Sequence, residues 1–303
     1  MHILIPESIL PASLARLKEK HSVHYDPDLV KRPAELLEAA KQADAMIVRR
    51  FTQVRGALLD GMSRCKAVGR LGVGLDNIDV ETCKQRGITV IPALGANARS
   101  VAEYVITTAM MLVRTAYQST PDVIAGKWPR NALIQGKEIF GCTLGIVGFG
   151  AIGRLTAELA SALGMQVMVY DTAPSLQSEA GYERVSLSEL YARSDVITLH
   201  VPLTPDTRNL INADSIACMK DGAIVINAAR GGVVDENALI NALRQGKLGG
   251  AALDTFENEP LAECPQYADV PNLILTPHIA GMTVQAEERV NVYVVEKLLE
   301  VIE

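Results

Sequence analysis

Short apolar runs rich in β-branched residues alternate along the chain with longer stretches whose apolar residues recur every three or four positions. In the first third the short runs are HILIP, SVHY, DAMIVR, KAVGRLG and ITVIP, and the longer stretches include SLARLKEKH and AELLEAAKQ. Apolar strands that alternate with helices are typical of a parallel sheet covered by helices. The pattern therefore predicts the α/β class, with one doubly wound sheet in this third.

A long helical pattern from about Ser100 to Tyr117 interrupts this rhythm before a second series of strands begins at TLGIV. The series continues through QVMVYD, DVITLHVP, GAIVINAA, GGAALD and NLILTP, and one further helical pattern closes the chain. Because the second sheet is complete by then, we expect the last helix to return to the first domain. The predicted domains are residues 1–96 with 281–303, around a continuous domain at 97–280.

Composition and charge argue against two classes of binding partner. The 303 residues carry 29 Lys and Arg against 35 Asp and Glu, a net charge of −6, and no basic run. Such a chain lacks the electrostatic footprint of a nucleic-acid or anionic-membrane partner. Neither a membrane span nor a secretion signal is evident, which predicts a cytoplasmic protein. The five scattered cysteines are predicted to be reduced packing residues, without a disulfide or metal site.

The strongest local motif is the G-x-G-x-x-G sequence formed by Gly148, Gly150 and Gly153, with Ala151 and Ile152 inside it. It directly follows an apolar strand pattern and directly precedes a helical one, the context in which such a loop binds a dinucleotide. The first glycine permits a tight turn, the second lets a pyrophosphate approach the backbone, and the third lets helix and strand pack closely. The alternative is a chance cluster in a chain with 23 glycines.

Asp171 ends the next predicted strand, 23 positions beyond Gly148. An acidic residue at about this spacing accepts hydrogen bonds from the adenosine ribose hydroxyls. Its charge would repel a 2′-phosphate, and the following Thr172-Ala173-Pro174 supplies no arginine to neutralise one. The sequence therefore favours NAD over NADP. An ordinary turn residue at the end of a strand is the alternative.

Three more polar segments follow predicted strands, where the carboxyl ends of a parallel sheet line a ligand crevice. Arg230 in NAARGG has the planar fork that suits a carboxylate, with a structural salt bridge as the alternative. His278 in TPHIAG is suited to exchanging a proton near neutral pH, and Glu259 in DTFENEP is a carboxylate able to stabilise its imidazolium form. Packing and surface exposure are the structural alternatives for these two.

Taken together with GRLGVGLDNID and GKWPR, these motifs resemble the D-isomer-specific 2-hydroxyacid dehydrogenases over essentially the whole chain, in the branch of phosphoglycerate and sulfolactate dehydrogenases. The resemblance implies a Rossmann nucleotide-binding domain and a discontinuous flavodoxin-like substrate domain. It also implies an NAD-dependent oxidoreductase that transfers a hydride between NAD(H) and a small 2-hydroxy or 2-keto acid. The C-terminal-binding corepressors share this fold, so a non-catalytic dinucleotide sensor is an alternative.

The resemblance also assigns residues. It implies that His278 exchanges the hydroxyl proton, that Glu259 orients the imidazole, and that Arg230 holds the substrate carboxylate. Further implied contacts are to the nicotinamide, from Asp254 and the backbone of Ala228 and Ala229, and to the substrate carboxylate, from the amides of Val73 and Gly74.

Substrate identity stays open between 3-phosphoglycerate and 3-sulfolactate, with a glyoxylate or hydroxypyruvate reductase as a further alternative. Arg49 stands where phosphoglycerate dehydrogenases place a cation for a second anionic group, and the roles of its neighbour Arg50 and of Arg70 are undecided. Solvated surface arginines are the alternative. Relatives associate through the region of Trp128, which implies a homodimer, and a buried packing role is the alternative for that side chain.

Overall fold

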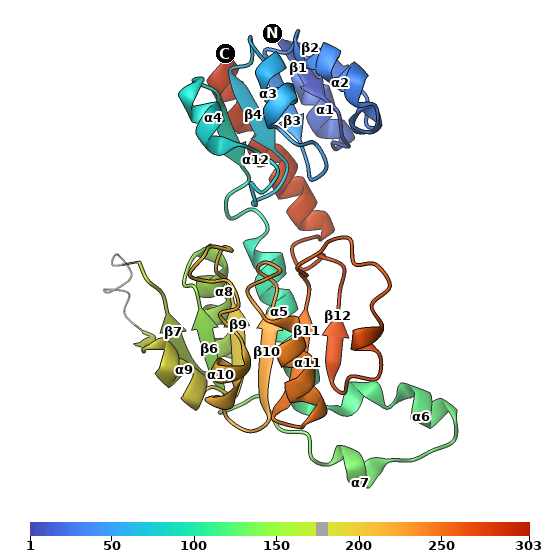
Figure 1. Ribbon diagram of the computed structural model, residues 1–303, viewed down its shortest axis with the longest axis vertical. Helices are drawn as coiled ribbons and strands as arrows, with labels where there is room; N and C mark the ends of the chain where they lie inside the picture. Colours follow the sequence, from blue (N-terminus) through green and yellow to red (C-terminus); the bar gives the residue numbers. More distant parts are fainter. Residues whose placement is uncertain (174–180) are drawn as a thin grey trace. The chain divides into compact units, whose positions relative to one another are not determined.

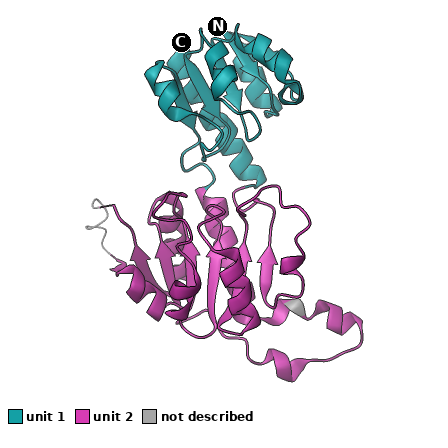
Figure 2. Cartoon of the chain, in the orientation of Figure 1, with its two compact units in different colours: residues 1–97, 282–303 teal, residues 98–281 magenta. Residues whose placement is uncertain are grey.

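The computed structural model describes residues 1–173 and 181–303, apart from the side chain of residue 118. The chain forms two compact units (Figure 2). Unit 1 comprises Met1–Asn97 with Met282–Glu303, and unit 2 comprises Ala98–Gly281. These divisions fall one residue from those expected from the sequence.

Unit 1 is built on a parallel sheet of five strands, ordered β2-β1-β3-β4-β5 (Figure 1). This is the flavodoxin-like order, in which the chain adds strands first on one side and then on the other. The strands are β1 His2–Ile5, β2 Ser22–Tyr25, β3 Ala45–Val48, β4 Ala67–Arg70 and β5 Thr89–Pro92.

Helices cover both faces of this sheet. Alternate strand residues pack on opposite sides, since Ile3 and Ile47 contact the last helix of the chain while Leu4 and Met46 contact the helices of the other face. The last helix thus belongs to unit 1, where its apolar residues are buried against this sheet. The helices are α1 Pro11–Lys18, α2 Pro33–Ala40, α3 Gly56–Gly61, α4 Val80–Gln85 and α12 Val284–Ile302, with a 3₁₀ turn at Leu29–Lys31.

Unit 2 is built on a parallel sheet of seven strands, ordered β12-β11-β10-β9-β6-β7-β8. Counted from β6, the order is that of the Rossmann fold with one strand added at the far edge. The two parallel sheets confirm the predicted fold class. The strands are β6 Thr143–Val147, β7 Gln166–Tyr170, β8 Glu183–Arg184, β9 Val196–Leu199, β10 Ala223–Asn227, β11 Leu248–Leu253 and β12 Leu273–Leu275.

The two faces of this sheet carry separate apolar cores. Ile146, Ile226 and Ala252 pack against α5 and α8 on one face, and Val147, Val225 and Leu253 pack against α9 to α11 on the other. The helices are α5 Ala98–Arg114, α6 Thr120–Ile124, α7 Arg130–Leu133, α8 Ala151–Ala162, α9 Leu187–Arg193, α10 Ala213–Ala217 and α11 Glu236–Arg244, with 3₁₀ turns at Ala116–Gln118 and Pro265–Tyr267.

Two details of the sequence-based prediction are wrong. The long helix, expected to reach Tyr117, ends at Arg114 because Thr115 takes a left-handed conformation with φ of 57°. Of the cysteines expected to pack inside, Cys218 is exposed, although Cys65, Cys83 and Cys142 are buried. In the described ranges every helix is too short or too polar to cross a membrane.

Candidate active site

The glycine loop connects β6 to α8, and each of its three glycines has its own structural reason. Gly148 has φ of 96°, and a Cβ there would lie 2.5 Å from the carbonyl oxygen of His200. A Cβ on Gly153 would lie 2.3 Å from the carbonyl oxygen of Gly148, so any side chain would separate helix from loop. A Cβ on Gly150 would meet no atom within 4 Å. The loop therefore leaves open space beside the first amides of a 12-residue helix, which fits a dinucleotide pyrophosphate.

Asp171 follows β7 and turns its carboxylate onto this loop. Oδ2 accepts a hydrogen bond of 2.6 Å from the Phe149 N–H, and Oδ1 accepts one of 2.7 Å from the Ala173 N–H. An anionic acceptor so placed suits the ribose of a dinucleotide bound on the loop. Arg184 donates at 2.6 Å to the carbonyl oxygen of Asp171, a contact that the sequence did not predict. Pro174, part of the argument against NADP, lies outside the described residues.

A tight turn after β10 positions Arg230. The buried Asn227 spans it, accepting from the Ala229 N–H at 3.1 Å and donating to the Arg230 carbonyl oxygen at 2.9 Å. The Arg230 guanidinium itself donates to the Ala229 carbonyl oxygen at 2.7 Å. A Cβ on Gly231 would lie 1.8 Å from the carbonyl oxygen of Phe256, so this turn packs directly on the segment that carries Glu259.

Glu259 and His278, 19 residues apart in the chain, meet beyond the ends of β11 and β12. Oε2 of Glu259 lies 2.8 Å from Nδ1 of His278, and Oε1 accepts a hydrogen bond of 2.9 Å from the Phe256 N–H. The carboxylate is thus anchored to the backbone on one side and to the imidazole on the other. The Glu259 side chain is 17% exposed and that of His278 is 39% exposed, so the fixed carboxylate supports a ring that solvent reaches.

The backbone around His278 is held in an unusual shape by Asp254. His278 has a left-handed φ of 58°, and its N–H donates to the Thr276 carbonyl oxygen at 3.0 Å. The Asp254 carboxylate, 1% exposed, accepts hydrogen bonds of 2.6 Å from the Thr276 hydroxyl and 2.8 Å from the N–H groups of both Ile279 and Ala280. Tyr104 lies 2.7 Å from the same Thr276 hydroxyl. Asp254 therefore shapes the turn that presents the imidazole.

His200, a second histidine at a strand end, has a different environment. Burial lowers its pKa to about 4, and its Nε2 lies 3.1 Å from the Thr198 hydroxyl. Because its carbonyl oxygen packs against Gly148, it belongs to the wall of the glycine loop. In the described ranges, no group of three or more His, Cys, Asp or Glu side chains is arranged to hold a metal ion.

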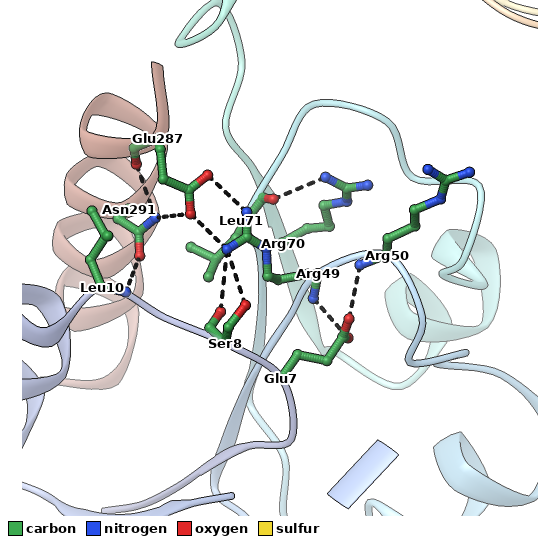
Figure 3. A network of polar contacts seen from close by, with 9 residues as sticks. All are labelled: Glu7, Ser8, Leu10, Arg49, Arg50, Arg70, Leu71, Glu287 and Asn291. Carbon is green, nitrogen blue, oxygen red and sulfur yellow. Dashed lines mark hydrogen bonds and ion pairs between the residues drawn. The ribbon is translucent and has the colours of Figure 1, made fainter. Parts of the chain in front are cut away.

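The remaining predicted residues, Arg49, Val73 and Gly74, lie in unit 1. Val73 and Gly74 form part of the partly exposed turn after β4, and Arg49 directly follows β3. The Arg49 fork is engaged by the carboxylate of Glu287 at 2.6 and 2.8 Å (Figure 3). The buried Glu7 accepts from the N–H groups of Arg49 and its next three residues. Neither glutamate was identified from the sequence.

The chain matches a family model, and it matches relatives over nearly all of its own length. Residues 106–280 match the NAD-binding domain of D-isomer specific 2-hydroxyacid dehydrogenases. An (S)-sulfolactate dehydrogenase of Chromohalobacter salexigens is 48% identical over 294 residues, which cover 95% of this chain and 94% of that protein. A D-3-phosphoglycerate dehydrogenase of Methanocaldococcus jannaschii is 40% identical over 99% of this chain but only 57% of its own length.

Solved structures agree with the sequence comparison. The structure of a D-lactate dehydrogenase from Aquifex aeolicus, complexed with NAD and lactic acid, superposes with a TM-score of 0.82 at 32% identity. The match covers 99% of this chain and 94% of that one. The family model and the long, highly similar relatives lead to one conclusion: this chain belongs to the D-isomer-specific 2-hydroxyacid dehydrogenase family and is an NAD-dependent oxidoreductase.

Proposed function

We propose that the protein interconverts a 2-hydroxy acid and its 2-keto acid with His278 as the acid–base group. The contact of 2.8 Å between Glu259 and His278 Nδ1 carries this proposal. The carboxylate contacts Nδ1 and holds the ring, so that Nε2 is the nitrogen that exchanges a proton with the substrate oxygen. In oxidation His278 accepts the hydroxyl proton, and in reduction it returns a proton to the carbonyl oxygen.

Bound NAD(H) would supply the hydride acceptor or donor. The loop of Gly148, Gly150 and Gly153 would hold its pyrophosphate, which the open space beside α8 supports. Asp171 would hold its ribose, which the position of the carboxylate beside this loop supports. Ala228, Ala229 and Asp254 would lie beside the nicotinamide. The three donors that fix Asp254 keep that part of the site from shifting.

Arg230 is the proposed partner of the substrate carboxylate. Its planar guanidinium can donate two parallel hydrogen bonds, and the neighbouring carbonyl of a keto acid would be polarised by the same charge. The Asn227 side chain and the close packing at Gly231 keep the Arg230 backbone in place. The amides of Val73 and Gly74 are further proposed contacts of a substrate carboxylate, because successive backbone N–H groups in a turn can bind an anion.

We infer that the substrate carries a second anionic group, bound by Arg49. Three arginines, Arg49, Arg50 and Arg70, stand at the carboxyl ends of β3 and β4, and such side chains bind phosphate and sulfonate oxygens. The similarity to a sulfolactate dehydrogenase favours 3-sulfolactate, with 3-phosphoglycerate as the other candidate.

Steady-state kinetics across a panel of acids test this proposal. The panel comprises sulfolactate, phosphoglycerate, glycerate and lactate, together with the corresponding keto acids, each with NAD(H) and NADP(H). The highest kcat/KM is expected for a doubly anionic acid with NAD(H). If hydroxypyruvate or glyoxylate is reduced far faster than either doubly anionic keto acid, the protein is a reductase without a distal anion site.

We also propose a homodimer in which residues 115–141 contact the second copy. Trp128 is 74% exposed in the single chain, which excludes a buried packing role within it. Exposed apolar side chains grouped in one segment mark an association surface. The segment also exposes Tyr117, Val123, Ile124, Ile134 and Phe140. Light scattering of the wild type and of Trp128→Ser is the test, with a smaller particle expected for the variant.

A further inference from the structure

Arg49 is held by a carboxylate of its own unit. Its two terminal nitrogens donate to the two oxygens of Glu287 at 2.6 and 2.8 Å, the bidentate arrangement in which guanidinium and carboxylate bind most strongly (Figure 3). The Arg49 side chain is 24% exposed and that of Glu287 is 30% exposed. Both charges are therefore partly shielded from water, and each strongly affects the other.

Glu287 is fixed in this position by its helix. It lies in the first turn of α12, which begins at Val284 and is capped by Thr283. The fully buried Asn291 donates to the Glu287 carbonyl oxygen at 2.9 Å and to its Oε1 at 3.1 Å. The Asn291 amide oxygen in turn accepts from the Leu10 N–H at 3.1 Å. The carboxylate is thus part of a network and not a mobile surface group.

Arg49 is fixed from its backbone side as well. Its N–H donates to Glu7 at 2.9 Å, and the N–H groups of Arg50, Phe51 and Thr52 donate to the same carboxylate at 3.0 to 3.1 Å. Ser8 Oγ accepts from the Arg49 guanidinium at 3.3 Å. Because the backbone and the guanidinium of Arg49 are both held, an anion that approaches Arg49 also approaches the negative charge of Glu287.

This geometry distinguishes anions by their charge. A phosphate ester carries about −1.5 to −2 at neutral pH, whereas a sulfonate carries a single negative charge and presents the same three oxygens. Repulsion by a fixed carboxylate grows with the charge of the ligand. Specificity gained by repelling the wrong ligand is a common device in binding sites.

We propose that Glu287 is a specificity-determining residue that favours a sulfonate over a phosphate as the distal group of the substrate. The inference rests on the proposed function, because it requires Arg49 to meet that group. Glu287 cancels part of the positive charge of Arg49, which reduces the electrostatic advantage that a dianion would have over a monoanion beside an uncompensated arginine. Arg49 thus attracts an anion, and Glu287 limits the charge of the anion that binds.

The test compares the wild type, Glu287→Gln and a matched control, Glu296→Gln, by kcat/KM for sulfolactate, phosphoglycerate and lactate with NAD. Glu296 lies on the same helix and pairs with Arg16 at 3.1 Å, away from Arg49. Glu287→Gln keeps the side-chain size and a hydrogen-bonding oxygen. It should raise the phosphoglycerate-to-sulfolactate ratio by roughly tenfold or more, mainly through KM, with lactate unchanged. Glu296→Gln should leave the ratio unchanged.

Further variants keep the outcome clear. Glu287→Asp retains the charge and should keep the wild-type ratio within a few-fold, which separates charge from side-chain packing. An unchanged ratio in a folded Glu287→Gln protein overturns the inference, and so does an equal rise for lactate. If the wild type uses neither doubly anionic acid, the proposed substrate class fails. The inference is then judged by the gain of phosphoglycerate turnover in Glu287→Gln, whose absence overturns it as well.

Discussion

In each compact unit a glutamate contacts a nitrogen-bearing side chain of the candidate site, and we propose that the two pairs have different roles. In unit 2, Glu259 contacts a single nitrogen of His278 at 2.8 Å. In unit 1, Glu287 contacts both terminal nitrogens of Arg49. An imidazole gains and loses a proton near neutral pH, whereas a guanidinium keeps its charge. The first pair is therefore suited to proton exchange and the second to setting a constant electrostatic potential.

The carboxylates of the two pairs are also anchored differently. Glu259 is tied to the backbone N–H of Phe256, inside a turn that packs on the Arg230 segment. Glu287 is tied to Asn291 within its own helix. A pair that must place a proton needs a fixed direction relative to the reacting atoms, which the turn supplies. A pair that only contributes an electrostatic potential needs a fixed position and no particular direction, and the first turn of a helix provides such a position.

Removal of the acid–base group should have the largest effect. His278→Ala is expected to lower kcat by the roughly 10²- to 10⁴-fold typical of a positioned acid–base residue, with NADH affinity nearly unchanged. Stopped-flow rates and fluorescence titration measure the two quantities. Because His278 has a left-handed backbone, His278→Asn is the second variant, since asparagine tolerates that conformation. His24→Ala, at an exposed position of unit 1, is the control. Normal turnover in both His278 variants would exclude the proposed mechanism.

Removal of the arginine should affect only some substrates. Arg49→Ala is expected to lower kcat/KM for doubly anionic acids by roughly ten- to a hundredfold, the worth of a charge-assisted contact, and to spare lactate. Because the variant leaves the Glu287 charge uncompensated, the double variant Arg49→Ala/Glu287→Gln should recover part of the loss. Arg64→Ala, which removes an exposed arginine that pairs with Asp44, is the control. Unchanged kinetics for both doubly anionic acids would remove Arg49 from the distal site.

A change of the carboxylate beside His278 should be milder than loss of the ring. Glu259→Gln keeps an oxygen for the Phe256 N–H but replaces a charged hydrogen bond to His278 by a neutral one, so kcat should fall by about tenfold. The same substitution at Glu257, whose carboxylate pairs with the exposed Arg208, is the matched control. Equal rates in the two variants would mean that Glu259 does not support the imidazole.

Glu7 should affect stability more than chemistry. Burial raises the pKa of Glu7, but hydrogen bonds from Thr52, Phe51 and Arg49 outweigh it and hold that pKa below its usual range. The carboxylate therefore stabilises the fold above its unfolded-state pKa, and this contribution is lost as the pH falls through the folded-state value. Glu7→Gln should lower the free energy of unfolding at pH 7 by about 1–3 kcal/mol.

The pH dependence distinguishes this effect from simple packing loss. Urea unfolding at several pH values should show the difference between wild type and Glu7→Gln shrinking as the pH drops below about 4.3, the ordinary value for glutamate. Glu38→Gln, at an exposed position paired with Lys41, should show no such difference. A gap that stays constant down to pH 3 would mean that the Glu7 charge does not stabilise the turn.

Local patterns in the sequence predicted the strands of both sheets apart from the short β8, and they singled out several residues of the candidate site. Strand and helix periods predicted both sheets because an apolar run must be buried wherever it folds. The glycine motif and Asp171 were recognisable because the close approach of helix and strand excludes any side chain at Gly153. His278, Glu259 and Arg230 were recognisable as polar residues that follow apolar strands.

The end of the long helix was not predictable in the same way. Apolar spacing continues to Tyr117, but Thr115 adopts a left-handed conformation that ends the helix at Arg114. Asn227 and Asp254 likewise look like ordinary polar residues at strand ends. Their roles depend on which backbone N–H groups lie opposite, and distant segments supply those groups.

By itself the sequence predicted the α/β class, the dinucleotide loop and the residue types of the proposed acid–base site, because each follows from a short motif or from a repeating period. Only the tertiary structure decided the charge that surrounds Arg49. Glu287 is 238 residues away in the chain and Glu7 is 42, and a pairing at such separation leaves no mark on local sequence. Because α12 packs on the first sheet, the Glu287 carboxylate reaches the Arg49 guanidinium. No sequence motif indicates this pairing, which we propose limits the charge of the anion that Arg49 binds.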